Sequence, residues 1–246
     1  IPNLEEITEG LSCHIVRFGK DKDHDDYYAE DVSYNNNAEL SFTCHAPAKE
    51  DRRITLKVPG KQYIADALAA IAACDICGAE DEAILASLYA FEGSDRRFQY
   101  KGTCNGFKII DDYAHHPTQI RVTIEAAKHI PHNRLYACYE PHTYTRTKAL
   151  MNEYIDALAT ADEVLLVPVF AARETDTLGV TIEAIAEKVE AKGTPCHCFN
   201  SIAEAKQWVL SNLKENDLLV SMGAGSIYQL ADDLVHYEYD FPEENQ

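Results

Sequence analysis

Basic residues are scarce in this chain of 246 residues: 22 Lys and Arg stand against 41 Asp and Glu, a formal net charge of −19. Because proteins that bind nucleic acid need a basic surface, this deficit argues against DNA or RNA as a partner. It leaves room for a small anionic substrate, since a local group of cations can focus positive potential within an acidic shell. The candidates for such a group are Arg96, Arg97, Lys101, Arg146 and Lys148.

Long hydrophobic runs are also missing. The longest apolar stretches, such as residues 67–74, are far shorter than the roughly 20 residues that a bilayer requires. No segment resembles a signal peptide, so we expect a cytoplasmic protein without membrane insertion. The eight cysteines lie mostly in or beside apolar helix and strand segments, and we expect them to be reduced.

No segment matches the phosphate-binding loop Gly-x-x-x-x-Gly-Lys-Ser/Thr. The nearest pairs, Gly19-Lys20 and Gly60-Lys61, lack both the leading glycine and the following Ser or Thr. We therefore expect no phosphate cradle of this type within the chain.

Two cysteine spacings resemble metal sites, but neither fits one. Cys74 and Cys77 continue an alanine-rich helix, and a metal knuckle would need a tight turn there. In Cys196-His197-Cys198, alternation along a strand sends His197 to the face opposite the two sulfur atoms. We expect no metal ligands in this chain.

From Arg96 onward, strand and helix patterns alternate. Apolar runs predict strands near 107–111, 134–139, 163–168, 195–199 and 217–221, and amphipathic segments predict helices near 118–129, 147–160, 181–191, 201–214 and 226–236. This alternation predicts an α/β fold in which a Rossmann-like, doubly wound parallel sheet forms the C-terminal part. Before it, we expect strands near 13–18, 39–45 and 52–58 and a helix that ends near Cys77, as in the end of another domain.

The most informative segment is Ile109-Ile110-Asp111-Asp112-Tyr113-Ala114-His115-His116-Pro117-Thr118. Two β-branched residues predict the end of a buried strand, and Pro117 suits the first turn of a helix. Ligands bind at such strand ends in open α/β sheets. In the alternative interpretation, Asp112 only caps the helix, and His115 and His116 are ordinary loop residues.

A second polar run, Pro141-His142-Thr143-Tyr144-Thr145-Arg146-Thr147, follows the next strand along the chain. We expect the two strands to be neighbours, which would bring both polar runs to the same edge of the sheet. Another interpretation is a metal hydrolase that uses Asp111, Asp112, His115 and His116, although the sequence contains no second cluster of carboxylates and histidines.

In combination, these motifs resemble the Mur ligase family. The resemblance rests on motifs in a fixed order: Val58-Pro59-Gly60, residues 66–70, Phe91-Glu92-Gly93, Arg96-Arg97-Phe98, residues 111–118, residues 141–147, and Gly223-Ala224-Gly225-Ser226. It implies that residues 1–94 are the C-terminal part of a central ATP-binding domain and residues 95–246 are a C-terminal Rossmann-like domain. The UDP-binding domain and the phosphate loop would lie outside this chain.

The branch of the family that the motifs resemble joins UDP-N-acetylmuramate to L-alanine, with ATP and Mg²⁺, in peptidoglycan synthesis. The resemblance implies an acyl phosphate that the amine of alanine attacks. We expect the isolated chain to be inactive because it lacks the groups that cradle the β- and γ-phosphates, and the resemblance places most Mg²⁺ ligands outside it as well. The alternatives are a ligase that recycles a tripeptide onto UDP-N-acetylmuramate and a binding module without catalysis.

On the nucleotide side, the resemblance implies that Arg97 and Asp112 are catalytic residues that also contact ATP, with Asp112 accepting a hydrogen bond from the ribose. It also implies a role for Asp66 near the adenine. There the chain departs from the family, because residues 62–66 read Gln-Tyr-Ile-Ala-Asp in place of His-Asn-x-x-Asn.

On the alanine side, the resemblance implies substrate contacts by Tyr113, His142 and Arg146. His115 is the candidate that orients or deprotonates the ammonium of alanine, with His142 second. Arg146 would hold the carboxylate through a forked pair of hydrogen bonds. Thr143 stands where many relatives carry arginine.

Overall fold

A computed structural model describes residues 3–35 and 38–237. Contacts divide the chain into two compact units: unit 1 contains residues 1–35, 39–57 and 61–91, and unit 2 contains residues 36–38, 58–60 and 92–246. The assignment of residues 1–94 and 95–246 to two ligase domains stays a prediction.

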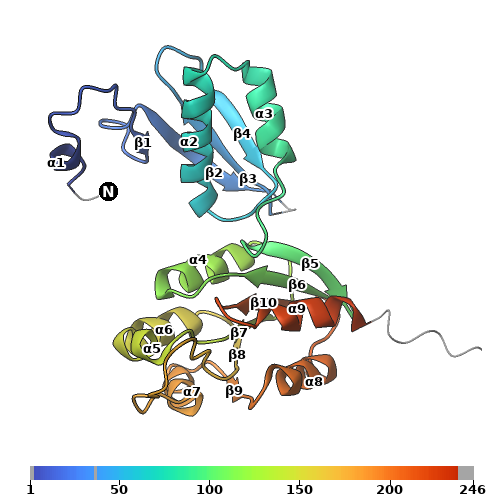
Figure 1. The fold of residues 1–246 in the computed structure, drawn as a ribbon. Helices are drawn as coiled ribbons and strands as arrows, with labels where there is room; N and C mark the ends of the chain where they lie inside the picture. The colour runs from blue at the N-terminus through green and yellow to red at the C-terminus, as the bar shows by residue number, and fades with distance from the viewer. Residues whose placement is uncertain (1–2, 36–37, 238–246) are drawn as a thin grey trace, which may run out of the picture. The chain divides into compact units, whose positions relative to one another are not determined.

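Unit 1 is a four-stranded sheet with α2 and α3 on one face (Figure 1). Its strands, in sheet order, are β1 (Phe18–Gly19), β2 (Tyr27–Tyr34), β3 (Leu40–His45) and β4 (Arg52–Leu56), and its helices are α1 (Leu4–Thr8), α2 (Gln62–Ile76) and α3 (Asp81–Ala90). β1 is parallel to β2, and the other neighbours are antiparallel. Alternate residues of β3 and β4 are buried, as expected for a sheet with one covered face.

The strand expected at 13–18 is almost absent, because β1 contains only Phe18 and Gly19. The strand expected at 52–58 ends at Leu56. β2 and α3 were not predicted. β2 lacks an apolar alternation because residues 30–33 are exposed, and it is held instead by pairing with β3.

Unit 2 has the doubly wound architecture that the sequence predicted. Its sheet order is β5-β6-β10-β7-β8-β9, and all neighbours are parallel except β5 and β6. The strands are β5 (Gln99–Cys104), β6 (Phe107–Asp112), β7 (Leu135–Tyr139), β8 (Glu163–Leu166), β9 (Cys196–Cys198) and β10 (Leu218–Met222). The helices are α4 (Pro117–Ala127), α5 (Tyr144–Ala149), α6 (Met151–Leu158), α7 (Ile182–Glu190), α8 (Ile202–Asn212) and α9 (Tyr228–Val235).

Two hydrophobic cores cover the two faces of this sheet. One combines buried residues of α4, α6 and α7 with the strands, and the other combines residues of α8 and α9 with the opposite face (Figure 1). Burial on both faces accounts for the continuous apolar runs in β7, β8 and β10.

The prediction for unit 2 differs from the structure in three details. β5 was not predicted, and it pairs antiparallel to β6 at the edge of the sheet. β6 and β7 are not neighbours, because β10 returns to the centre of the sheet and pairs with both. The helix expected at 147–160 is two helices, α5 and α6, which break at Leu150, where φ is −114° and ψ is 24°.

The Cys-His-Cys segment alternates across β9 as expected. Cys196 and Cys198 pack with one core, whereas Nε2 of His197 lies 2.6 Å from Oε1 of Glu163 and its ring contacts Trp208. No group of three or more potential ligands within residues 3–35 and 38–237 could hold a metal ion. Over the same residues, no helix has the length and apolarity needed to cross a bilayer.

Candidate functional site

The carboxyl ends of three strands meet at the candidate site in unit 2. Met222, the last residue of β10, pairs with Asp112 of β6 on one side and with Tyr139 of β7 on the other. The loops that follow these strands therefore leave the same edge of the sheet. In open α/β folds, ligands bind at this edge of the sheet.

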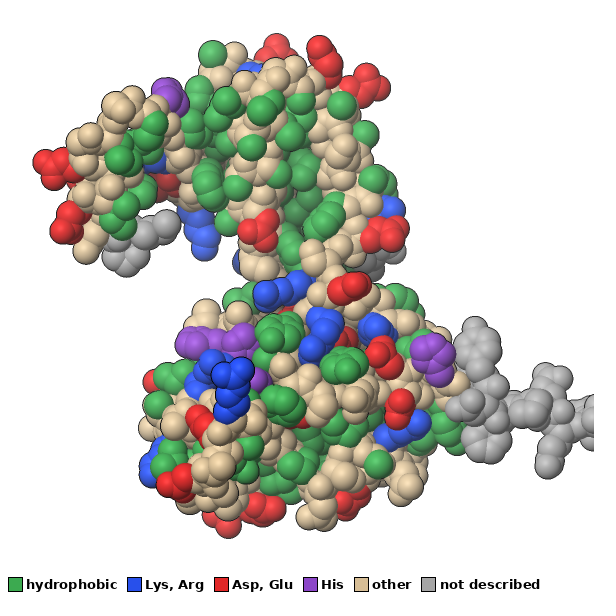
Figure 2. Space-filling model, viewed as in Figure 1, with side chains coloured by type: hydrophobic (Ala, Val, Ile, Leu, Met, Phe, Trp, Pro, Cys, Tyr) green, Lys and Arg blue, Asp and Glu red, His purple; other side chains and the backbone are tan. Residues whose placement is uncertain are grey.

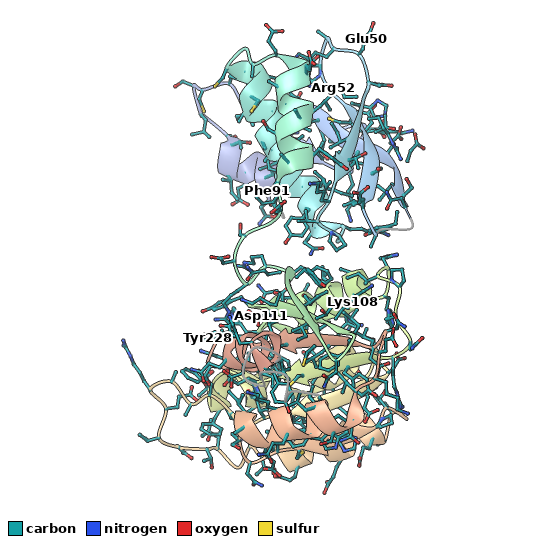
Figure 3. The ribbon with its side chains drawn as sticks, turned by 90° about the vertical axis from the view of Figure 1, so that its right-hand side faces the viewer. Glu50, Arg52, Phe91, Lys108, Asp111 and Tyr228 are labelled. Atoms are coloured by element: carbon teal, nitrogen blue, oxygen red, sulfur yellow. The ribbon has the colours of Figure 1, made fainter. Side chains whose placement is uncertain are left out.

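Arg96 links the β6 end to the loop after β10. Its Nε donates to Oδ2 of Asp111 at 3.1 Å, and its Nη2 donates to the carbonyl oxygen of Gly223 at 2.8 Å. The guanidinium also lies between the rings of Tyr113 and Tyr228, 4.9 and 4.8 Å from their centroids. Figure 3 shows Asp111 and Tyr228 toward the same side of unit 2. Arg96 is thus fully engaged in holding the site together.

Arg97, the predicted catalytic arginine, is exposed beside this network. Its guanidinium lies 5.8 Å from the ring centroid of Tyr113, and its charge acts on Asp112. Tyr113 thus contacts both arginines. The contact of Arg97 with a nucleotide stays a prediction.

Asp112 is 6% exposed and accepts three internal hydrogen bonds. Oδ2 accepts from the amide of Phe98 at 3.1 Å and the hydroxyl of Thr123 at 3.0 Å, and Oδ1 accepts from the amide of Ala114 at 2.9 Å. Burial raises its pKa to about 6, against the lowering effect of these donors. A carboxylate has about four acceptor positions, so one is left for the predicted ribose contact.

Asp112→Asn is expected to destabilise unit 2 by about 1–3 kcal/mol, because an amide nitrogen cannot accept from a buried backbone amide. The folded pKa lies above the unfolded value, so the stability of the wild type falls as pH rises from about 4 to about 6. The asparagine variant lacks this titration. The difference in free energy of unfolding between the wild type and the variant should therefore shrink between pH 4.5 and 7.5. Denaturant titrations at both pH values measure it. A difference in unfolding free energy that does not change with pH would contradict the raised pKa of Asp112.

The hydrogen bonds of His115 fix which of its ring nitrogens carries the proton. Its Nδ1 lies 2.9 Å from the carbonyl oxygen of Tyr113, which can only accept, so Nδ1 carries the proton and the lone pair of the neutral ring is on Nε2. The backbone is held on both sides: Oε1 of Gln119 accepts from its amide at 3.1 Å, and its carbonyl oxygen accepts from the hydroxyl of Tyr154 at 2.8 Å.

His116, next to it, has a structural role. It is the N-cap of α4, where its Nδ1 accepts from the amide of Thr118 at 3.3 Å. The cap is therefore His116, whereas the alternative interpretation had assigned it to Asp112. Asp111 accepts from Arg96 and from the hydroxyl of Ser221 at 2.7 Å. These separate partners speak against the metal-hydrolase interpretation.

His142 lies beside His115, with ring centroids 6.0 Å apart, and stacks on Phe170 at 5.4 Å. Burial, then the charge of Arg146 and the neighbouring His115, lowers its pKa. Its buried Nδ1 has no hydrogen-bond partner within the part of the chain that the structure describes. On the face of unit 2 in Figure 2, histidines gather beside Lys and Arg side chains.

Arg146 is in the first turn of α5, and its charge acts on His142, Tyr139 and Tyr154. Its Nη1 is buried and has no hydrogen-bond partner among the described residues. A buried guanidinium donor without an acceptor is costly, so this atom is suited to an external anion. The predicted grip on the carboxylate of alanine is consistent with this geometry and stays a prediction.

Sequence reasoning missed Glu174, which caps the helix that carries Arg146. The N-cap residue Thr143 has a φ of 66° and makes no side-chain cap. Instead, Oε2 of Glu174 accepts from the amides of Tyr144 at 2.5 Å and Thr145 at 3.1 Å, and the hydroxyl of Thr145 also donates to this carboxylate. The hydrogen bonds from Thr145 lower the pKa of Glu174. A cap that comes from 29 or 30 residues away has no local sequence motif, so it could not be predicted from the sequence near α5.

Glu174→Ala is expected to fray α5, because a six-residue helix is too short to be stable without its cap. Hydrogen exchange should accelerate roughly fivefold or more at the amides of Thr147 and Leu150, which bond within the helix. Glu187→Ala, an exposed change on α7, is the control and should leave both amides unchanged. Equal exchange rates in the Glu174→Ala and Glu187→Ala variants would show that Glu174 does not stabilise α5.

Asp66, the residue predicted on the adenine side, is exposed on α2 in unit 1. In the same helix, Oε1 of Gln62 is buried without a hydrogen-bond partner among the described residues. The role of Asp66 stays a prediction.

Comparisons with known proteins identify the family of the chain. The family described as "Mur ligase, glutamate ligase domain" matches residues 96–225. A UDP-N-acetylmuramate–L-alanine ligase of Agathobacter rectalis is 43% identical over 96% of this chain and 51% of its own length. The chain thus spans about half the length of the curated relatives it matches.

Two solved structures share the fold. UDP-N-acetylmuramate-alanine ligase MurC of Thermotoga maritima superposes with a TM-score of 0.76 at 26% identity, covering 92% of this chain and 48% of its own. MurF ligase of the same organism, solved in complex with ADP, gives 0.66 at 15% identity, covering 91% and 48%. The match to the family over more than half of the residues, at the strand ends described above, shows that this chain belongs to the Mur ligase family.

Proposed function

We propose that this chain is part of an ATP-dependent ligase of the cytoplasm that joins UDP-N-acetylmuramate to L-alanine in peptidoglycan synthesis. The observation that carries the proposal is the cluster of His115, His142 and Arg146 at the sheet edge. The hydrogen bond of Nδ1 leaves the lone pair of a neutral His115 ring on Nε2, and Nη1 of Arg146 is buried without an acceptor among the described residues. The identity to an L-alanine ligase and the ADP-bound relative of the same fold support the substrate and the nucleotide.

In the proposed reaction, ATP supplies the phosphoryl group that activates the muramoyl carboxylate as an acyl phosphate. His115 takes a proton from the ammonium of alanine through Nε2, because only the neutral amine can attack. Arg146 holds the alanine carboxylate, and His142, with its lowered pKa, stays neutral beside it. The neutral amine nitrogen then bonds to the acyl carbon and gives a tetrahedral intermediate. Its carbon–oxygen bond to the phosphate breaks, inorganic phosphate leaves, and the nitrogen releases a second proton to give the amide.

On the nucleotide side, Arg97 would stabilise negative charge, and Asp112 would hold the turn after β6 and accept from the ribose. Tyr113 aligns Arg97 through its ring. Asp66 would contribute near the adenine. Since the chain contains no phosphate-loop sequence, the β- and γ-phosphates and Mg²⁺ would be held mainly by the rest of the ligase.

The proposal is tested with the complete product of the gene, supplied with ATP, Mg²⁺, UDP-N-acetylmuramate and either L-alanine or a muramoyl tripeptide. Mass spectrometry should show the L-alanine product with one ADP per amide formed. A preference for the tripeptide would assign the recycling reaction instead. No ligation, together with no phosphate loop anywhere in the reading frame, would favour a non-catalytic module.

The 246-residue chain alone is expected to show neither ATP hydrolysis nor ligation above a blank, because cradling of the phosphates needs groups that its sequence lacks. A coupled ADP assay at high protein concentration measures this, with the His115→Ala variant as the matched background. Turnover by the wild-type chain that disappears in this variant would show that the chain is catalytically sufficient.

A further inference from the structure

Glu140 is a buried carboxylate at the centre of the site, and neither the sequence motifs nor the proposed reaction gives it a role. It follows β7 directly and is 3% exposed. Its amide continues the sheet by donating to the carbonyl oxygen of Met222 at 3.0 Å. A buried carboxylate persists only where it is hydrogen-bonded, so its partners indicate its purpose.

The partners of Glu140 all come from the loop after β10. Oε1 accepts from the hydroxyl of Ser226 at 2.8 Å, and Oε2 accepts from the amide of Ile227 at 3.2 Å. Burial raises the pKa of Glu140, while these donors and the charge of Arg96 act in the opposite direction. The side chain therefore fastens the loop after β7 to the loop after β10.

The glycines of that loop permit this close packing. A Cβ on Gly225 would lie 2.3 Å from Oε2 of Glu140 and 2.5 Å from Cγ of Phe170. At Gly223, where φ is 156°, it would lie 3.1 Å from both Cβ and the carbonyl oxygen of Glu140. The Gly-Ala-Gly-Ser sequence thus has a local physical reason: larger residues would displace Glu140 or Phe170.

From this junction, contacts reach both sides of the site. On one side, Gly223 accepts from Arg96 through its carbonyl oxygen, and its amide donates to the carbonyl oxygen of Asp112 at 3.2 Å. On the other side, Phe170 stacks on His142 and accepts through its carbonyl oxygen from the amide of Thr143 at 2.9 Å. The loops that hold Arg96 and His142 are therefore joined through Glu140 and its neighbours.

We propose that Glu140 is a positioning residue that locks the loop after β10 to the loop after β7, so that the Arg96 side and the His142 side of the site keep one arrangement. This inference rests on the proposed function for its catalytic consequence. The required property is the pair of hydrogen bonds. An amide at position 140 can accept from the amide of Ile227 and donate to the hydroxyl of Ser226, because a hydroxyl can accept as well as donate.

The linkage is tested first in the 246-residue chain by hydrogen exchange. Glu140→Leu keeps similar volume without hydrogen bonds, and it should accelerate exchange tenfold or more at the amides of Ile227 and Thr143, whereas Glu140→Gln should change both less than threefold. The amide of Val220, inside β10, is the reference and should stay protected. Faster exchange at Ile227 alone would overturn the linkage.

A second variant keeps the test decisive if Glu140→Leu does not fold. Ser226→Ala removes one hydrogen bond of Glu140 and should accelerate exchange at the amides of Ile227 and Thr143 by threefold or more. No change at Thr143 would again overturn the linkage between the two loops.

The catalytic consequence is tested in the complete ligase. Glu140→Leu should lower kcat tenfold or more and change KM for ATP and L-alanine less than threefold, because a small displacement between the two sides affects the reacting geometry more than binding. Glu140→Gln should restore kcat to within threefold of wild type. An unchanged kcat in Glu140→Leu, or a Gln variant as slow as Leu, would overturn the proposal. A wild-type enzyme that does not ligate L-alanine would sink the proposed function instead, and hydrogen exchange would still decide the linkage.

Discussion

Replacing Arg52 with methionine is expected to lower the free energy of unfolding of unit 1 by about 3–5 kcal/mol, the range for breaking a buried ion pair from one side. The Arg52 and Asp75 side chains are 6% and 5% exposed, and the two nitrogens of Arg52 bond to the two oxygens of Asp75 at 2.9 and 2.7 Å. Burial alone would raise the pKa of Asp75, but hydrogen bonds from Arg52 and Lys49 hold it at about 2. The methionine variant would leave this carboxylate buried with one cation fewer.

Denaturant titration, with hydrogen exchange in β3 to identify unit 1, measures the loss. Arg53→Met changes the exposed neighbour on β4 and should cost much less. The double variant Arg52→Met with Asp75→Leu should recover most of the stability, because it removes both charges together. A cost below about 1 kcal/mol for Arg52→Met would mean that solvent reaches the pair and that the packing of α2 on the sheet does not depend on it.

The sequence predicted most elements of unit 2 because their burial is periodic, but it missed β5, which has only one buried residue. Strands covered on both faces are mainly apolar, and helices such as α7 bury residues at helical spacing. Periodicity does not encode which strands become neighbours. β10 is last along the chain and yet lies between β6 and β7, so the two polar runs face each other across the Gly223 loop. β2 was not predicted either, because it has no apolar alternation and is held by its pairing with β3.

Within the site, the sequence drew attention to residues with reactive or charged side chains and missed residues that hold the site together. His115, His142 and Arg146 stand in conspicuous motifs, and the structure brings their loops to one edge. Glu174 is an isolated acidic residue in a loop, and its role depends on a contact made 29 or 30 residues away. The family resemblance implied that Asp112 contacts the ribose, and the structure adds three donors from its own surroundings that the sequence did not predict.

In the complete ligase, Arg146→Ala is expected to lower kcat/KM for L-alanine at least about 30-fold, since truncating one partner of a buried charge pair costs about 2–5 kcal/mol. Arg146→Lys keeps the charge and should still lose roughly tenfold or more, because an ammonium cannot reproduce the guanidinium fork on a carboxylate. The loss should appear mainly as a higher KM for L-alanine, with KM for ATP little changed. Arg121→Lys, an exposed change on α4, is the matched control. Steady-state kinetics with each substrate varied in turn measures the split.

The stability of the same variants separates a ligand-binding arginine from a structural one. When an arginine with a structural role is replaced, the fold loses the hydrogen bonds of its side chain and becomes less stable. Nη1 of Arg146 instead lies buried without an acceptor in the described chain, so both replacements remove an unsatisfied donor, and Arg146→Ala also removes the charge that lowers the pKa of His142. Arg146→Lys and Arg146→Ala should therefore melt at or above the wild-type temperature while alanine use falls. If both variants melt several degrees lower and retain the wild-type KM for L-alanine, Arg146 is part of the scaffold, and the amino-acid site must lie outside this loop.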